Sequence, residues 1–401
     1  MTTTADRLRD LVADCAPHAV GIRHDLHAHP ELMYEEERTS RVVREELARL
    51  GVEHLGGLAG GTGVLAHLPA TTPDGAKKPS VALRADMDAL PILERTGVAY
   101  SSTTDGVMHA CGHDGHTATL LCAAAALAKV EHRPNPVTFL FQPAEEGGAG
   151  GERMCADGAL DGSRLGTRVG RVFGLHGWPS LEIGHVSTKP GPLLAATDDF
   201  AARISGHQAH AAMPHTGVDP IVAGAHIVSA LQTIASRTVD PLDSVVCTVG
   251  RFEGGSANNV IPESVEIAGT IRSLRAETRA TAERRFREIV ELTAKAHGCR
   301  VEIDWKTGYP VTDNHPEATA FFERIARDTL GAARLERTPD PFMGGEDFAF
   351  YGAVAPACFF LLGLQRPGDA SPAMLHTPDF DFNDDALPIG AELFCRLALA
   401  E

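Results

Sequence analysis

Short apolar runs alternate along the chain with longer stretches whose apolar residues recur at helical spacing. The runs at 81–87, 137–142, 171–176 and 357–363 are rich in apolar residues, as buried strands are. Stretches between them, such as 115–130, place Ala and Leu at helical intervals. This alternation predicts an α/β fold, a mostly parallel central sheet flanked by helices on both faces.

The pattern changes in the middle of the chain. Alternating residues predict strands at 198–206, 244–255, 260–274 and 299–305, and amphipathic patterns predict helices at 219–237 and 276–298. The order β-α-β-β-α-β is that of a ferredoxin-like unit. We therefore expect two domains: residues 1–191 and 307–401 form the α/β domain, and residues 192–306 form a small inserted domain.

The composition makes some partners poor candidates. Asp and Glu number 53 and Lys and Arg 36, for a net charge of −17, and no basic run offers a site for nucleic acid or an anionic membrane. The N-terminus lacks the apolar core of a signal peptide, and the longest apolar run, 119–128, is too short to span a bilayer. The eight cysteines are scattered, without a C-x-x-C pair. We therefore expect a cytoplasmic protein without a disulfide framework.

Polar clusters accompany the predicted strands. They are "RADMDALP" (84–91), "MHACGHDGHTA" (108–118), "QPAEEGGAGG" (142–151), "LHGWP" (175–179) and "LHTPDFDFN" (375–383). Open α/β sheets place their sites at the carboxyl ends of the strands. Each cluster supplies His, Cys, Asp or Glu, so together they favour one shared site over solvated surface.

The residue types in these clusters are those of a metal site. Taken alone, Cys111 could be a metal ligand, a nucleophile, a redox thiol or a packed small residue. Five candidate ligands stand in the clusters: Cys111, His113, His176, His376 and one carboxylate of the Glu145–Glu146 pair. This number exceeds the ligand set of a single tetrahedral catalytic zinc and suits two neighbouring metal ions.

Other histidines receive a different interpretation. The segment "RHDLHAHPEL" (23–32) ends a helical stretch, whereas the H-x-H pair of barrel amidohydrolases ends a strand. We therefore interpret His24, His27 and His29 as structural or as supports of the ligands, and His109 and His116 in the same way.

With these motifs in order, the chain resembles the metal-dependent amidohydrolase branch of the aminoacylase/carboxypeptidase superfamily. That branch holds hippurate hydrolases, N-acyl-amino-acid amidohydrolases and plant auxin-conjugate hydrolases. The resemblance covers essentially the whole chain and also includes "GHQAHAAMPH", "SANNVIP" and "MGGEDFAFY". It implies a dinuclear metallopeptidase-like catalytic domain, an inserted lid and dimerisation domain, and a homodimer or higher homo-oligomer formed through that lid.

The resemblance also implies roles for single residues. The matched ligands of two divalent ions are Cys111, His113, Glu146, His176 and His376. Glu145 matches the general base and Asp86 an aspartate that orients a group of the metal site. His210 matches a histidine that reaches a catalytic site, in several relatives that of the partner subunit, and Asn259 and Arg272 match substrate contacts.

One position departs from the wider superfamily. This chain has Arg84-Ala85-Asp86 where many relatives have H-x-D, so one ligand must come from elsewhere, and Cys111 can supply it. This substitution is typical of the amidohydrolase branch.

The implied activity is hydrolysis of the amide bond of N-acyl-L-amino acids, hippurate-like or N-acetyl-like, by a water that two metal ions activate. Zinc or manganese fits the ligands, and cobalt or nickel is an alternative. Deacetylation of N-acetyl-diaminopimelate, or a dipeptidase or carboxypeptidase activity, is the alternative within the superfamily. A cysteine hydrolase with Cys111 as nucleophile, and a non-catalytic binding protein, are the alternatives outside it.

Overall fold

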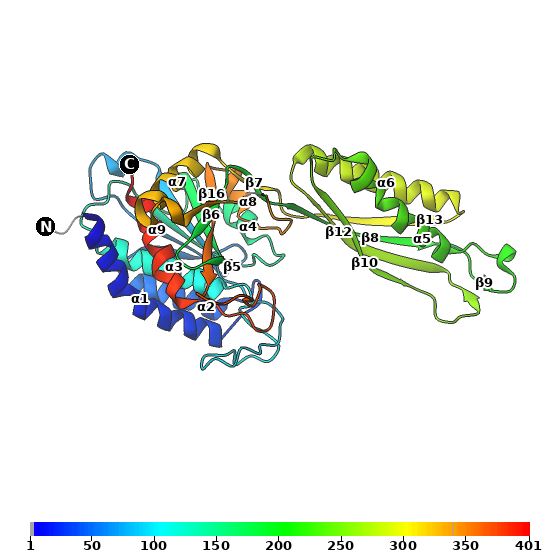
Figure 1. The fold of residues 1–401 in the computed structure, drawn as a ribbon, viewed down its shortest axis with the longest axis horizontal. Coiled ribbons are helices and arrows are strands. Elements are labelled where there is room, and N and C mark those ends of the chain that lie inside the picture. Colours follow the sequence, from blue (N-terminus) through cyan, green and yellow to red (C-terminus); the bar gives the residue numbers. More distant parts are fainter. Residues whose placement is uncertain (1–3, 339) are drawn as a thin grey trace. The chain divides into compact units, whose positions relative to one another are not determined.

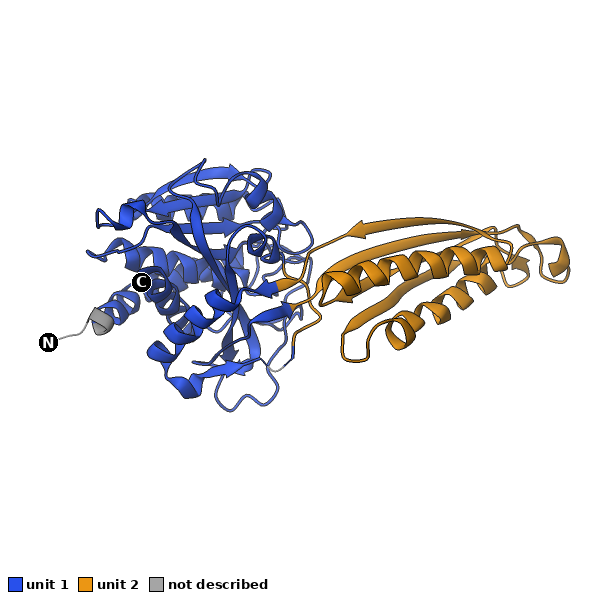
Figure 2. Ribbon diagram, turned by 90° about the horizontal axis from the view of Figure 1, so that it is seen from above, with its two compact units in different colours: residues 1–193, 313–340, 347–401 blue, residues 194–312, 341–346 orange. Residues whose placement is uncertain are grey.

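The computed structural model describes residues 4–338 and 340–401 (Figure 1). The chain forms two compact units, one of residues 1–193, 313–340 and 347–401 and one of residues 194–312 and 341–346 (Figure 2). The sequence placed 341–346 with the first of these. They belong to the second because Leu194 forms a parallel bridge with Phe342, and the N–H of Ala195 donates to the carbonyl of Gly344. The independence of 192–306 as a domain stays a prediction.

The first unit consists of helices and strands in alternation. Its helices are α1 (Thr4–Ala28), α2 (Glu37–Arg49), α3 (His113–Ala128), α4 (Gly150–Ala156), α7 (Pro316–Leu330), α8 (Ala349–Gly352) and α9 (Leu387–Leu399). Its strands are β1 (Glu53–Leu58), β2 (Gly63–Leu68), β3 (Ser80–Asp86), β4 (Val137–Gln142), β5 (Val169–Glu182), β6 (Val186–Thr188), β15 (Leu335–Arg337) and β16 (Ala357–Gln365). No helix in the described part of the chain has both the length and the apolar character needed to cross a membrane.

These strands form one sheet of eight, in the order β1-β2-β4-β3-β5-β16-β6-β15. The central strands β4, β3, β5 and β16 are parallel, whereas β1 and β2 add an antiparallel edge. The prediction of a mostly parallel sheet is therefore confirmed.

Residues of alternate parity on the central strands point to opposite faces of the sheet. Phe139, Phe141 and Leu83 face a core that α1, α3, α7 and α9 complete. On the other face α4 contacts β4 and α8 contacts β16, where the rings of Phe348 and Phe359 lie 4.9 Å apart. Helix α3 is buried along its length because its small Ala side chains let α1 and α9 pack closely against it.

The second unit has the predicted ferredoxin-like order. Its main elements are β8 (Ala196–Ser205), α5 (Pro220–Leu231), β10 (Val245–Gly254), β12 (Ser264–Ser273), α6 (Ala276–Ala296) and β13 (Arg300–Thr307), with the short pair β9 (Ala209–His210) and β11 (Val260–Ile261). The sheet order is β10-β12-β8-β13 and every pairing is antiparallel. Strands β7 (Gly191–Leu194) and β14 (Thr312–Asn314) lie where the chain passes between the units.

The predicted continuous helix over 219–237 is wrong. Helix α5 ends at Leu231 and a π-helical turn follows over Ile234–Thr238. The reason is local: the hydroxyl of Thr233 donates to the carbonyl of Ala230, and the hydroxyl of Thr238 donates to the carbonyl of Thr233. Such side-chain bonds compete with the regular helical ladder.

A buried cation joins the two ends of the first unit's sequence. Arg23 on α1 is fully buried, and its guanidinium lies 3.2 Å from Asp114 on α3 and 3.1 Å from Asp381 near the C-terminus. A third carboxylate, that of Asp384, lies 2.5 Å away. The arginine therefore fixes α1, the start of α3 and the 381–384 segment together.

Replacing Arg23 by Met should destabilise the protein by about 3–5 kcal/mol, because it leaves the carboxylate of Asp114 buried without this charge partner. Urea unfolding measures the change. The matched control is Arg41→Met, which removes an exposed arginine 3.9 Å from Glu45 and should cost less than about 1 kcal/mol. Equal losses in the two variants would contradict this account of Arg23.

Candidate metal centre

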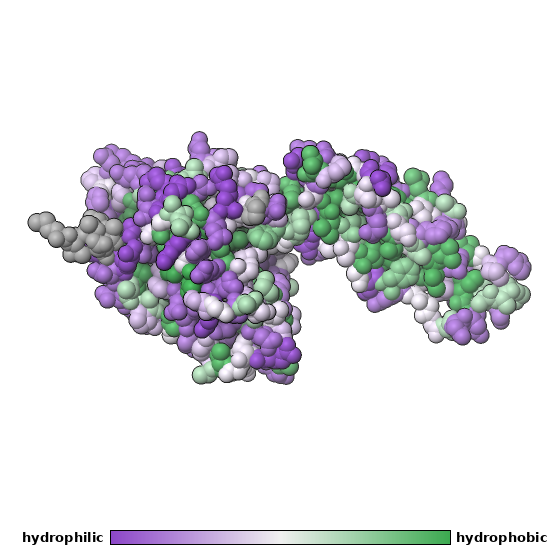
Figure 3. Space-filling model, viewed as in Figure 1, coloured by the Kyte–Doolittle hydropathy of each residue, from purple (hydrophilic) through white to green (hydrophobic). Residues whose placement is uncertain are grey.

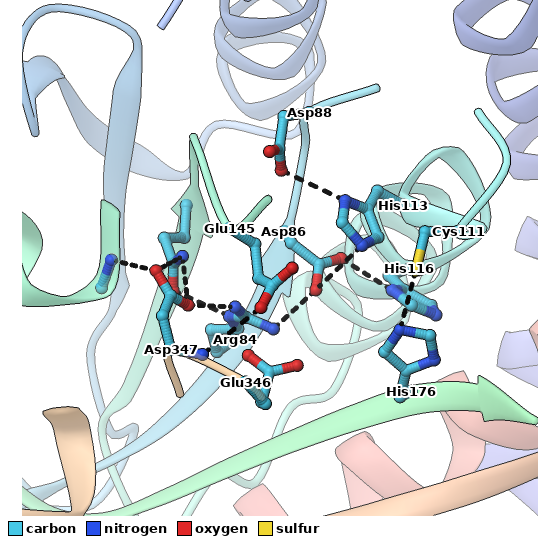
Figure 4. A network of polar contacts seen from close by, with 12 residues as sticks. Arg84, Asp86, Asp88, Cys111, His113, His116, Glu145, His176, Glu346 and Asp347 are labelled. Carbon is cyan, nitrogen blue, oxygen red and sulfur yellow. Dashed lines mark hydrogen bonds and ion pairs between the residues drawn. The ribbon is translucent and has the colours of Figure 1, made fainter. Parts of the chain in front are cut away.

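The predicted site residues of the first unit meet where the central strands end. Asp86 is the last residue of β3, Glu145 follows β4, and Cys111 and His113 stand at the start of α3 (Figure 4). Glu146 is the next residue after Glu145. His176 lies within β5, which continues to Glu182, although the sequence predicted an end at 176. The strand is longer because β16 pairs with it in parallel as far as Trp178 and, after a shift in register, again at Glu182.

The ligand atoms of these residues form overlapping groups. Within each group all atoms lie within 4.8 Å of one another, and the groups are Cys111, His113 and His176; His113, Glu145 and Glu146; and Cys111, Glu146 and His376. The Sγ of Cys111 lies 3.3 Å from Nε2 of His176, and Nε2 of His376 lies 3.1 Å from Oε1 of Glu146. All six residues from the predicted ligand and base set therefore converge.

Hydrogen bonds orient the two buried histidines for metal binding. Nδ1–H of His113 donates to Oδ1 of Asp88, and its buried Nε2 has no hydrogen-bond partner. Nδ1–H of His176 donates to the carbonyl of Gly177, and its Nε2 faces Cys111. Metal-binding histidines in proteins use the same arrangement: one nitrogen donates to an oxygen and the other is left for the ion. The residues present therefore fit divalent ions.

The electrostatics of the cluster also favour a cation. Burial, reinforced by Glu146 and Glu145, raises the pKa of the Cys111 thiol well above its usual value. A nucleophilic cysteine needs the opposite shift, so this position does not suit a cysteine hydrolase. Burial alone would lower the pKa of His113, but Asp86 and Asp88 outweigh it and raise that pKa to about 10. The cluster thus holds protons that metal ions would displace.

Two backbone positions in the left-handed region shape the site. Gly112, with φ of +85°, separates Cys111 from His113 and forms the start of α3. His376 has φ of +61°, which is uncommon for a residue with a side chain, and its N–H donates to the carbonyl of Ala110. This bond holds the late loop that carries His376 beside the residues preceding Cys111.

Comparison with known proteins agrees with this geometry. The model of Peptidase family M20/M25/M40 matches residues 82–400. The chain is 40% identical to the IAA-amino acid hydrolase ILR1-like 4 of Arabidopsis thaliana over 94% of its own length and 84% of that protein. It is also 40% identical to an N-acetyl-L-cysteine deacetylase of Bacillus subtilis, over 92% and 84% of the two chains.

A solved structure has the same fold. The YXEP protein of Bacillus subtilis, described as a dinuclear metal binding peptidase from the M20 family, superposes with a TM-score of 0.81 at 32% identity, over 96% of this chain and 98% of that one.

The chain belongs to Peptidase family M20/M25/M40. The predicted resemblance to the amidohydrolase branch is confirmed by the relatives, and with it the prediction of a metal-dependent amidohydrolase.

Asp88 of this M20 chain was not singled out from the sequence, although it lies in the quoted motif "RADMDALP". Its Oδ1 accepts from His113 and its Oδ2 accepts from the backbone N–H of Glu146, so one carboxylate positions two candidate ligands. Two aspartates at spacing i, i+2 after a buried strand are the signal that could have identified it.

Glu36 and Asp347 were also missed. The Oε1 of Glu36 accepts from the N–H of Ala144, immediately before the glutamate pair, and Oδ2 of Asp347 accepts from the N–H of Gly151 after it. Together they hold both ends of the loop that carries Glu145. Asp347 lies in the quoted motif "MGGEDFAFY", which was the signal that could have identified it, whereas nothing in the local sequence distinguishes Glu36 from an acidic residue on the surface.

Three of the histidines interpreted as structural, His24, His27 and His29, have partners away from the ligand atoms, whereas neither ring nitrogen of His109 has a hydrogen-bond partner in the part of the chain that the structure describes. His27 contacts Asp114 and Glu94, and His24 contacts Asp384. His109 is buried, and burial lowers its pKa to about 4. Nδ1 of His29, the residue after α1, donates to the carbonyl of Asp25 in that helix.

The remaining predicted site residues belong to the second unit. His210 ends β9 and is exposed, and its Nδ1 accepts from the N–H of Ala212. Asn259 is exposed just before β11. Arg272 is half-buried on β12, where it pairs in register with Thr197 of β8. The roles of these three residues stay predictions.

Glu36→Gln should change how stability depends on pH. Burial raises the folded-state pKa of Glu36 to about 7 from 4.5, so the folded chain retains a proton that the unfolded chain releases. This proton stabilises the fold at low pH, and its contribution is lost as pH rises from about 4.5 to about 7.

Urea unfolding at pH 5 and pH 8 tests this. The variant should gain up to about 3 kcal/mol relative to the wild type between the two pH values, since glutamine needs no proton. The exposed Glu37→Gln provides the control and should show no such change. A constant difference between wild type and Glu36→Gln would contradict the shifted pKa.

Proposed function

We propose that this M20 chain hydrolyses the amide bond of N-acyl-L-amino acids of the hippurate or N-acetyl class. The observation that carries the proposal is the convergence of Cys111, His113 and His176 with the Glu145–Glu146 pair and His376. The relatives support the substrate class, because their names describe hydrolysis of an indoleacetyl amino acid and deacetylation of an N-acetyl amino acid.

In this proposal five side chains hold two divalent ions: Cys111, His113, Glu146, His176 and His376. When bound, the ions supply positive charge that acidifies a shared water and polarises the amide carbonyl. The Cys111 thiolate favours zinc, and the imidazoles and carboxylate also accept manganese, cobalt or nickel. Asp86 and Asp88 act by orienting the histidines around these ligands.

Glu145 is the proposed general base. Its carboxylate lies within 4.8 Å of ligand atoms of His113 and Glu146, and the backbone N–H of Asp347 donates to it at 3.4 Å. It takes a proton from the attacking water and later delivers that proton to the amine that leaves. Because Glu145 is buried, bulk water does not compete with it for this proton.

Substrate recognition is assigned to the second unit. Arg272 carries a permanent charge that suits the substrate carboxylate, and Asn259 is a second substrate contact. His210 is proposed as a catalytic residue that stabilises the oxyanion formed when water attacks the amide. The amino acid and acyl group remain open within this class, and N-acetyl-diaminopimelate is the alternative substrate.

We also keep the proposed homodimer through the second unit. Strand β10 is an edge of its sheet, and Phe252 on that strand and Val222 on α5 are exposed at 42% and 44%. Figure 3 shows hydrophobic residues among polar ones on the visible face of this unit. An unpaired edge with apolar neighbours permits strand-to-strand association.

A panel of N-acetyl, N-benzoyl and N-indoleacetyl amino acids, assayed with Mn²⁺ and Zn²⁺, tests the proposed reaction. Glu145→Gln should lower kcat by about 10²–10⁴-fold, because the proton acceptor is lost, while the metal content is unchanged. Glu37→Gln is the control and should retain full activity. A wild type that cleaves no member of the panel, or a fully active Glu145→Gln, would refute the proposal.

Cys111→Ser tests the thiolate ligand. The hydroxyl is a poorer donor for a soft ion, so the Kd for Zn²⁺ should rise by at least about tenfold, with a smaller change for Mn²⁺. Chelator competition measures both constants. The buried thiol of Cys358, on the central strand β16, offers the control Cys358→Ser, which should leave both constants unchanged. Tight binding of both metals by Cys111→Ser would show that Cys111 is not a ligand.

A further inference from the structure

A continuous chain of buried hydrogen bonds runs behind the candidate ligand His176. The guanidinium of Arg84 donates to Oδ2 of Asp86 at 2.6 Å, and Nδ1–H of His116 donates to Oδ1 of the same carboxylate at 2.7 Å. The N–H of Gly177 donates to Nε2 of His116 at 2.8 Å, and Nδ1–H of His176 donates to the carbonyl of Gly177 at 2.8 Å. Figure 4 shows four of these five residues beside Cys111.

The direction of each bond in this chain is determined. Asp86 beside Arg84 can only accept, so Nδ1 of His116 carries a hydrogen. The backbone N–H of Gly177 can only donate, so Nε2 of His116 has none. His116 is therefore a neutral imidazole in one tautomer, with both nitrogens in use, and it has no lone pair left for a metal ion.

We propose that His116 is a positioning residue for the metal centre: it binds the N–H of Gly177, and by holding the backbone of that residue it fixes the carbonyl that sets the tautomer and direction of His176. Asp86 and Arg84 anchor His116 in turn. The inference rests on the proposed metal ligands. His116 also lies close to Asp86 and His113, so its position alone would be compatible with a ligand; its hydrogen bonds assign it the positioning role instead.

The position of the chain explains why this link is needed. His176 lies in the middle of β5, where regular sheet pairing orients the backbone but leaves the ring free to rotate about its side-chain bonds. Its Nδ1 donates to the carbonyl of the next residue, Gly177, so the backbone position of Gly177 decides where Nε2 of His176 points, and His116 holds that backbone through the Gly177 N–H. His116 and His176 pack edge to face, with ring centroids 4.7 Å apart, which leaves little space for another arrangement.

Two substitutions separate the two bonds of His116. Asparagine places an amide nitrogen near the position of Nδ1 and can still donate to Asp86, but it has no atom near Nε2 for the Gly177 N–H. Glutamine places an amide oxygen near the position of Nε2 and can accept from Gly177, but it loses the donor to Asp86. Each variant therefore loses one buried hydrogen bond.

The test measures Co²⁺ binding to the metal-free protein by chelator competition and by the visible absorption of bound Co²⁺. His116→Asn should raise the Kd by about 10–100-fold and alter the Co²⁺ spectrum, whereas His116→Gln should stay within about threefold with the wild-type spectrum. Both should bind two equivalents. Thermal unfolding of the metal-free variants should show similar falls in Tm, so lost stability alone would not produce this difference.

The matched control is His67, a buried histidine on β2 that belongs to no candidate ligand group. His67→Asn and His67→Gln should leave the Kd and the spectrum of bound Co²⁺ unchanged. If the two His116 variants bind Co²⁺ equally, whether both bind normally or both lose affinity, the proposal is overturned. If both variants bind one equivalent of Co²⁺ fewer than the wild type, His116 is a ligand instead. If His116→Asn does not fold, the spectrum of His116→Gln decides: a wild-type spectrum supports the proposal and a shifted one overturns it.

These outcomes are independent of hydrolysis because no substrate is present. A wild type that binds Co²⁺ but cleaves no N-acyl amino acid would refute the proposed function and leave this inference standing. A wild type that cleaves them, with two indistinguishable His116 variants, would refute only the inference.

Discussion

The structure of the catalytic unit depends on how negative charge is held at the carboxyl ends of its central strands. Asp86, Asp88, Glu145 and Asp347 are all buried there, and Glu146 is nearly so. Buried carboxylates are costly unless cations and hydrogen-bond donors surround them. Arg84 is the permanent cation among them, fully buried and 2.9 Å from Asp347 as well as 2.6 Å from Asp86. Divalent ions held by the candidate ligands would complete the balance.

This constraint explains the division of labour among the acidic residues. Those that contact Arg84 or backbone N–H groups are compensated by the protein itself, and they fix the loops and the histidines. Glu146 instead approaches Cys111, His113 and His376, which are themselves candidate ligands of the ions. A carboxylate therefore acts as a support or as a candidate ligand according to which groups contact it.

Most of the fold could be predicted from the sequence, and where a prediction was wrong the physical reason can be named. The parallel strands and the ferredoxin-like order follow from local periodicity, which a single segment carries by itself. The helix predicted over 219–237 was too long because Thr and Ser side chains bonding nearby carbonyls are not visible in an apolar pattern. The segment 341–346 was misplaced because its partner, Leu194, lies far away along the chain.

By itself, the sequence determined which chemistry is possible. Cys, His and Glu recur after buried strands in an order specific enough to identify the M20 amidohydrolase branch, since residue type sets ligand softness and charge. Only the tertiary structure decided which histidines turn toward the cluster of candidate ligands and which are bound by other groups. His113 and His116 stand three residues apart on one helix. Nε2 of His113 has no hydrogen-bond partner among the described residues, whereas Nε2 of His116 accepts a hydrogen bond from the N–H of Gly177. That difference arises from the contact of His116 with Gly177, 61 residues apart, which local sequence cannot encode because only the folded chain brings these groups together.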